Sequence, residues 1–168
     1  ADLHGAITQV TPPIDKQFEI RQMPKNKKKL VGVSGFIDRL SGRKGERMVS
    51  FIASDLADEA DFVASGEGWP LRTINHDFAG LCNFYNSLDL YVCASSIEGI
   101  PMPPLEALRC GIPVIIPCGV GILDDLPSIP GITRWQPGEG QQASLEQAIA
   151  KALLAPPVDR EALAKVTE

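Results

Sequence analysis

Short apolar, strand-like segments alternate with helix-like segments along most of this 168-residue chain. In the helix-like segments the apolar residues recur at intervals of three and four, which places them on one face of an α-helix. The expected strands cover residues 30–34, 61–64, 72–75, 90–94, 113–116 and 132–135. Because strands that alternate with helices build βαβ units, the sequence predicts an α/β fold, a Rossmann-like, mostly parallel sheet with helices on both faces.

The expected helices lie around residues 48–56, 78–88, 104–109, 145–154 and 159–166. Ser144, with Gln147 three residues later, has the spacing of a capping box that opens the fourth of these helices at Leu145. The same pattern divides the chain into three parts. Residues 1–29 are a lead-in or interdomain linker with a short strand at 7–10, residues 30–155 are the Rossmann-like domain, and residues 156–168 are a C-terminal helical tail.

The composition is that of an ordinary globular protein and excludes several function classes. A net charge of -5 argues against a nucleic-acid partner, since such proteins carry a clustered basic surface. The one basic run, Lys25–Lys29, is interpreted as a solvated linker, with attraction to lipid headgroups as the alternative. No apolar run approaches the ~20 residues of a membrane span, and no signal-peptide pattern opens the chain, so a cytoplasmic location is expected.

The four cysteines show no C-x-x-C pair, and three of them fall on apolar elements. We expect buried free thiols in a reducing compartment, rather than zinc ligands or disulfides. The cysteines are Cys82, Cys93, Cys110 and Cys118.

Two carboxylates separated by seven residues dominate the segment from Ser95 to Ile115, which reads SSIEGIPMPPLEALRCGIPVI. Glu98 follows an expected strand, and Glu106 is expected in the first turn of the next helix. In an open α/β sheet, the crevice at the carboxyl ends of the strands is where ligands bind. Two acids in that position suggest hydrogen bonding to a polyhydroxylated ligand.

Four motifs in order now support a family resemblance. They are GRKG (Gly42 to Gly45), SGEGWP (Ser65 to Pro70), FYNSLDLYVCASSIEG (Phe84 to Gly99) and PPLEALRCGIPVI (Pro103 to Ile115). From about residue 29 to residue 154, the chain resembles the C-terminal, nucleotide-sugar-binding domain of GT-B-fold retaining glycosyltransferases of family 4. The paired acids alone would be a weak signal, but the flanking motifs and strands make the resemblance specific.

The resemblance implies that Glu98 faces the donor sugar and that Glu106 holds the ribose hydroxyls. The alternative for Glu98 is a solvated loop acid, and for Glu106 an acid that complements the helix macrodipole. The resemblance also implies that Lys44 and Arg39 bind the diphosphate. The family pattern has a glycine just before that arginine, whereas this chain has Asp38. Arg43 is the spare candidate for the arginine.

In the segment after Glu98, Pro101, Pro103 and Pro104 replace residues that commonly supply backbone amides in similar enzymes. They are tolerated in a first helical turn but remove donors from a helix end that could cradle phosphate. The diphosphate should therefore depend on Lys44 and Arg39 more than is usual. The backbone amides that remain as candidates for binding the diphosphate are those of Gly99, Ile100, Met102 and Leu105. In SGEGWP, Gly66 and Gly68 either contact the nucleotide or form an ordinary strand-to-helix turn.

What the resemblance implies is a donor-binding domain of a hexosyltransferase-type enzyme, which transfers a sugar from a nucleotide diphosphate sugar to an acceptor hydroxyl. No metal or other cofactor is expected, because the nucleotide sugar is a substrate. The N-terminal acceptor-binding domain is expected to be missing from this chain, which alone would bind donor weakly and turn over nothing. Peripheral contact with the inner face of the membrane, through that domain, is a possible partner interaction.

Other function classes lack their signatures. A non-catalytic nucleotide-binding or assembly module with the same fold stays open as the alternative, and a sugar-nucleotide epimerase would need histidines that are not supplied. The chain has no G-x-G-x-x-G fingerprint of a dehydrogenase and no G-x-x-x-x-G-K-[ST] phosphate loop. Neither His4 nor His76 pairs with a serine in a nucleophile elbow.

Overall fold

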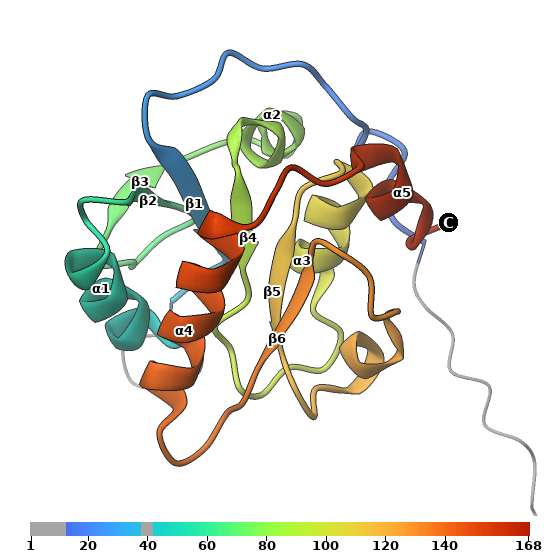
Figure 1. Ribbon diagram of the computed structural model, residues 1–168. Helices are drawn as coiled ribbons and strands as arrows, with labels where there is room; N and C mark the ends of the chain where they lie inside the picture. The colour runs from blue at the N-terminus through green and yellow to red at the C-terminus, as the bar shows by residue number, and fades with distance from the viewer. Residues whose placement is uncertain (1–12, 38–41) are drawn as a thin grey trace, which may run out of the picture.

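A six-stranded parallel sheet, covered by helices on both faces, forms the centre of the molecule (Figure 1). The computed structural model describes residues 13–37 and 42–168. Its strands are β1 (Lys29–Ser34), β2 (Ala60–Ser65), β3 (Arg72–Ile74), β4 (Leu90–Val92), β5 (Val114–Pro117) and β6 (Ile132–Trp135). Its helices are α1 (Glu46–Asp55), α2 (Gly80–Ser87), α3 (Met102–Arg109), α4 (Gln141–Leu154), α5 (Arg160–Lys165) and the 3₁₀ helix η1 (Gly121–Asp125).

The strand order is β3-β2-β1-β4-β5-β6, and each neighbouring pair is parallel. Chain order therefore runs outward from the middle of the sheet in both directions. This is the order of a doubly wound Rossmann-like fold, and the sequence prediction of that fold is confirmed. The switch in direction falls between β1 and β4, which are hydrogen-bonded neighbours.

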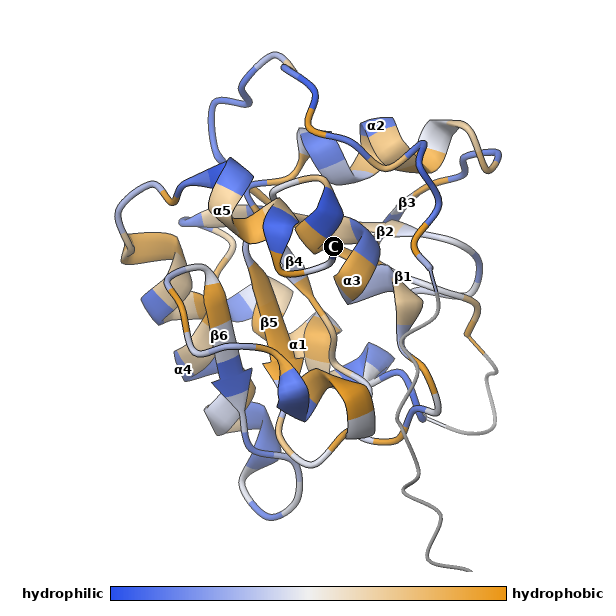
Figure 2. Cartoon of the chain, turned by 90° about the vertical axis from the view of Figure 1, so that its right-hand side faces the viewer, coloured by the Kyte–Doolittle hydropathy of each residue, from blue (hydrophilic) through white to orange (hydrophobic). Residues whose placement is uncertain are grey.

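Alternate residues of each central strand face opposite layers of the core. In β4, Leu90 and Val92 join the layer beneath α1 and α4, while Tyr91 joins the layer beneath α2, α3 and α5. Figure 1 shows these two groups of helices on opposite sides of the sheet. Since both faces are covered, the central strands are largely apolar, as β5 shows in the middle of Figure 2. This double burial is why short β-branched runs were visible in the sequence.

Two expected helix starts are wrong. Helix α3 begins at Met102, two residues before the expected start, because Pro103 and Pro104 fit its first turn, where their missing N–H groups cost little. Glu106 consequently lies in the second turn and not in the first. Helix α4 begins at Gln141 after Gly140, whose φ of 71° is left-handed.

Ser144 consequently lies inside helix α4, and the capping-box prediction is wrong. Its hydroxyl accepts a hydrogen bond of 2.9 Å from the backbone N–H of Gln136 instead. The hydroxyl thus ties the loop after β6 to the helix. Strand β4 is also shorter than expected and ends at Val92, whereas the expected strand at residues 7–10 lies outside the described residues.

Cys82, Cys93 and Cys110 are buried free thiols, as the sequence predicted, and Cys118 is a half-buried free thiol. The sulfur atoms of Cys82 and Cys110 lie 4.0 Å apart within the core.

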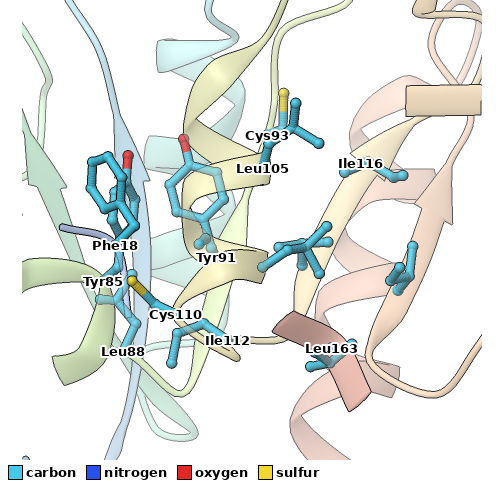
Figure 3. Close-up of a cluster of buried hydrophobic side chains, with 14 of the residues drawn as sticks. Phe18, Tyr85, Leu88, Tyr91, Cys93, Leu105, Cys110, Ile112, Ile116 and Leu163 are labelled. Atoms are coloured by element: carbon cyan, nitrogen blue, oxygen red, sulfur yellow. The ribbon is translucent and has the colours of Figure 1, made fainter. Parts of the chain in front are cut away.

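The described part of the lead-in packs onto the domain. Phe18 is 1% exposed, and its ring meets Tyr85 of α2 edge-on with centroids 5.8 Å apart. Figure 3 shows the two side chains together. Farther along, the backbone N–H of Arg21 donates to the Asn86 side chain at 2.7 Å, and the Arg21 carbonyl accepts from Arg160 of α5 at 3.2 Å. Phe18 therefore belongs to the same core as the helices, and the backbone of Arg21 is hydrogen-bonded to two of them.

We expect Phe18→Ala to lower the free energy of unfolding by about 3 kcal/mol, because it empties a fully buried aromatic site. The measurement is urea unfolding of the chain. Phe51→Ala is the matched control, since Phe51 is 62% exposed on α1, and it should change the free energy by less than about 0.5 kcal/mol. Equal losses for the two variants would show that the lead-in does not contribute to the core.

Candidate functional site

The candidate site lies where the loops after β1 and β4 leave the sheet. Strand β1 leads to α1 on one face, and β4 leads to α3 on the opposite face. Because these adjacent strands send their crossovers to opposite sides, their two loops separate and leave a crevice between them. Both members of the acid pair and the expected phosphate-binding lysine lie on these loops or at the helix that follows.

Gly45 brings the loop after β1 against the end of β4. It precedes α1 with a left-handed φ of 68°. A Cβ at this position would stand 2.6 Å from the carbonyl oxygen of Ala94, so only glycine allows the approach. The neighbouring residue Lys44 is thereby held beside the loop that carries Glu98.

Glu98 forms ion pairs with two cations of the GRKG segment. Lys44 Nζ donates to Oε1 of Glu98 at 2.5 Å, and Arg43 donates to Oε2 at 3.0 Å. The side chains of Glu98 and Lys44 are 11% and 17% exposed, whereas Arg43 is 47% exposed. The lysine and the carboxylate thus form a largely buried pair, and Arg43 covers it from the solvent side.

These cations set the charge state of Glu98. Burial alone raises the pKa of its carboxyl, but hydrogen bonds from Lys44 and Ser95, with the charges of Lys44 and Arg43, outweigh burial. The pKa therefore lies below its ordinary value, and Glu98 is an anion at neutral pH.

Glu106 lies on α3 and lines a neighbouring pocket of about 460 Å³. The hydroxyl of Tyr85 donates to its Oε2 at 2.7 Å. Burial raises the pKa of the Glu106 carboxyl, the hydrogen bond from Tyr85 opposes this rise, and the charge of Asp15 adds to it. The pocket is lined by Ser34, Gly35, Phe36, Ser65, Gly66, Glu67, Asn75, His76, Leu81, Tyr85, Pro103 and Glu106.

The two acids occupy adjacent hollows. The small hollow around Lys44 and Glu98 and the larger pocket of Glu106 share Ser34 and Pro103 in their linings. A ligand that reached from one hollow to the other would meet a cationic end and a carboxylate end.

Both glycines of SGEGWP allow close backbone packing. A Cβ on Gly66 would stand 2.3 Å from the Gly35 carbonyl oxygen, and one on Gly68 would stand 2.9 Å from Ile37. Both have positive φ, 108° and 84°. Gly66 also lines the Glu106 pocket, whereas Gly68 serves the packing of the two loops.

The expected amide donors differ in their surroundings. A Cβ on Gly99 would meet nothing within 4 Å, and Ile100 is 55% exposed, so both lie on the open face of the loop. Met102 opens α3, whereas the side chain of Leu105 is 2% exposed in the core. Arg39, the expected partner of Lys44, lies outside the described residues.

Two contacts in the site were not expected from the sequence. The sequence makes Arg43 the spare candidate for the diphosphate, and the structure pairs it with Glu98. The sequence prediction gives Tyr85 no role beyond its place in the helix expected around residues 78–88, whereas its hydroxyl donates to Glu106. A signal for the second contact existed, because a buried tyrosine hydroxyl needs a hydrogen-bond partner.

Within residues 13–37 and 42–168, no group of three or more His, Cys, Asp or Glu side chains is placed to hold a metal ion. Across the same ranges, every helix is too short or too polar to cross a bilayer.

Sequence comparison finds one family whose model matches more than half of the chain. Residues 75–166 match the model described as Glycosyl transferases group 1. This range contains the whole segment from β4 to α5, including both acids. A comparison with curated proteins finds no match.

Solved structures share the fold at low sequence identity. Sucrose-phosphate synthase from Thermosynechococcus elongatus superposes with a TM-score of 0.71 and 16% identity, over 95% of this chain and 46% of that one. The catalytic domain of starch synthase IV from Arabidopsis thaliana, bound to ADP and acarbose, superposes with a TM-score of 0.60 and 19% identity. The match covers 90% of this chain and 36% of that one. The chain thus spans less than half the length of either protein.

A third similar structure is comparable in length to this chain. It is the C-terminal domain of a glycosyl transferase group 1 family protein, LpcC, from Francisella tularensis. It gives a TM-score of 0.59 and 18% identity, over 83% of this chain and 80% of that one.

The Glu98 ion pairs predict a pH-dependent stability. A carboxyl whose pKa is lowered on folding stabilises the native state above its ordinary pKa of 4.5 and loses that effect as pH falls through the lowered folded value. Glu98→Gln should therefore lower the free energy of unfolding by about 1 kcal/mol near neutral pH. In acid, the free energies of unfolding of the variant and the parent chain should become equal. Urea unfolding at neutral and at acidic pH measures the difference.

Glu139→Gln is the control for this series, because Glu139 is exposed and joins no ion pair among the described residues. It should follow the parent chain at both pH values. If the difference in free energy of unfolding between Glu98→Gln and the parent chain stays constant with pH, the ion pairs of Glu98 do not stabilise the fold as expected.

Proposed function

The chain belongs to the glycosyl transferases group 1 family, and from this premise we propose that it is the donor-binding domain of a retaining glycosyltransferase. The enzyme, of family 4 and hexosyltransferase type, would move a sugar from a nucleotide diphosphate sugar to an acceptor hydroxyl. The acceptor site would belong to a separate N-terminal domain. Without that domain, this chain would bind donor and complete no turnover.

The observation that carries the proposal is the cluster of Lys44, Arg43 and Glu98 at the switch point of the sheet. Two cations beside one carboxylate leave a net positive charge in a partly buried crevice. A diphosphate brings more negative charge than Glu98, so it competes for both cations when it enters. Glu98 is then free to accept hydrogen bonds from sugar hydroxyls, the role that the resemblance assigns to it.

The pocket of Glu106 suits the nucleoside. Its volume of about 460 Å³ is in the range of small-molecule sites, and its wall combines apolar side chains with the carboxylates of Glu67 and Glu106. Oε2 of Glu106 is bound by Tyr85, whereas Oε1 accepts no hydrogen bond from any described residue. A ribose hydroxyl is a donor of the kind that this oxygen can accept.

In the proposed reaction the cations act on the leaving group. As the bond to the sugar breaks, negative charge grows on the diphosphate, and Lys44 with Arg43 stabilises it. Arg39 would add a third cation. The acceptor would attack an oxocarbenium-like carbon from the same face as the departing diphosphate, which retains the configuration. The charge is supplied by side chains, so the proposal needs no metal ion.

Two of the similar structures agree with this assignment by their own descriptions. The starch synthase IV structure is described as bound to ADP, a nucleoside diphosphate. The LpcC structure is described as a C-terminal domain of a group 1 glycosyl transferase.

We expect nucleoside diphosphates to bind this chain and the corresponding monophosphates to bind less well. Isothermal calorimetry with UDP, ADP and GDP measures the affinity. Lys44→Ala should weaken diphosphate binding about ten- to a hundredfold, the effect of one lost charged hydrogen bond.

Lys151→Ala is the matched control, since Lys151 is an exposed lysine of α4 that lines neither of the two hollows. Pro104→Ala should also have a smaller effect than Lys44→Ala. Absence of diphosphate binding by the parent chain would favour a non-catalytic assembly module. Equal small losses for the Lys44 and Pro104 variants would refute the role of Lys44.

A further inference from the structure

Tyr85 contacts one of the two acids directly from a different element. It comes from α2, while Glu106 comes from α3, and the two are 21 residues apart in sequence. The tyrosine is 1% exposed, and its hydroxyl donates to Oε2 of Glu106 at 2.7 Å. Both residues line the large pocket, but Tyr85 is almost wholly buried, whereas Oε1 of Glu106 accepts no hydrogen bond from the described residues.

Three aromatic rings hold the ring of Tyr85 in place. Phe18, Phe84 and Tyr91 approach it edge-on, with centroid separations of 5.8, 5.6 and 5.6 Å. Figure 3 shows Phe18 and Tyr85 close together, with Tyr91 to their right. A side chain enclosed in this way has little rotational freedom, so its hydroxyl is held at a fixed point.

We propose that Tyr85 is a positioning residue for Glu106, whose hydroxyl fixes one carboxylate oxygen so that the other faces the pocket as a hydrogen-bond acceptor. The inference rests on the proposed function in one respect, that the acceptor oxygen meets a ribose hydroxyl. The physical basis is simple. A glutamate side chain has several rotamers, and one short hydrogen bond from a rigid donor selects among them before the ligand arrives.

The surroundings of Glu106 make this donor important. Burial and the charge of Asp15 favour the protonated carboxyl, and the bond from Tyr85 is the contact that favours the ionised form. Tyr91 on β4 also lies near the carboxylate, and Glu67 and His76 line the same pocket. Without the Tyr85 hydroxyl, the pKa of Glu106 should rise further, and a protonated carboxyl is a weaker acceptor for a sugar hydroxyl.

Tyr91 supplies a matched control. It is a buried tyrosine in the same cluster, but its hydroxyl is hydrogen-bonded to Ser34 at 2.9 Å instead of to Glu106. Tyr85→Phe and Tyr91→Phe therefore remove the same atom from neighbouring buried rings. A purely structural effect of losing a buried hydroxyl would be alike in the two variants.

The first experiment titrates the Glu106 carboxyl by carbon-13 NMR in the parent chain and in both variants. We expect the midpoint to move to higher pH in Tyr85→Phe and to stay near the parent value in Tyr91→Phe. An unchanged midpoint in Tyr85→Phe would overturn the proposal. This measurement needs no nucleotide, so it decides the question even if the proposed function is wrong.

The second experiment measures binding of UDP and of its 2′,3′-dideoxy analogue. Tyr85→Phe should weaken UDP binding about three- to tenfold and leave binding of the dideoxy analogue unchanged. With Glu106→Gln already present, Tyr85→Phe should add little, because the two changes remove one interaction. Equal losses for both ligands would overturn the positioning role, whereas a parent chain that binds neither would overturn the proposed function alone.

Discussion

Adjacent strands β1 and β4 send their chains to opposite faces of the sheet, and the candidate site depends on this reversal. Here the loops separate, and the glycine at position 45 lets one of them return to touch the backbone of Ala94. The reversal makes the crevice, and this close approach places Lys44 beside Glu98. Both features belong to the backbone, so they exist before any ligand does.

The two acids of the site are held in different electrostatic environments. Cations lower the pKa of Glu98, whereas burial raises that of Glu106. The two carboxyl groups therefore differ in pKa because their surroundings differ. An acid that is firmly ionised and paired with lysine suits exchange with an anionic ligand. An acid that is less solvated and held by a neutral hydroxyl suits hydrogen bonding with a neutral ligand group. The separation agrees with the proposal that one end of the crevice meets phosphate and sugar and the other meets a ribose.

The sequence predicted the sheet well because its strands are buried on both faces, which leaves uninterrupted apolar runs such as that of β5. It also placed Lys44 and Glu98 on the correct loops, since a residue that follows a strand in this fold must lie at the carboxyl edge. The failures involved competition between local and distant partners. Ser144 had the spacing of a helix cap, but Gly140 started the helix earlier and the hydroxyl bonded Gln136. The pairing of Tyr85 with Glu106 joins two helices. The sequence indicates that a buried tyrosine hydroxyl needs a partner, but no local pattern identifies which side chain supplies it.

The lead-in extends the same reasoning beyond the crevice. Phe18 packs on the ring of Tyr85, and the hydroxyl of that ring bonds Glu106. Asp15, three residues before Phe18, also acts on the charge of Glu106. The segment before β1 therefore affects Glu106 twice, through the fixed position of an aromatic ring and through a nearby negative charge. A residue outside the strand-and-helix repeat thus helps to set the geometry at the pocket. The boundary of the folded unit, defined by its contacts, consequently includes Phe18, although the repeating pattern of strands and helices begins later in the sequence.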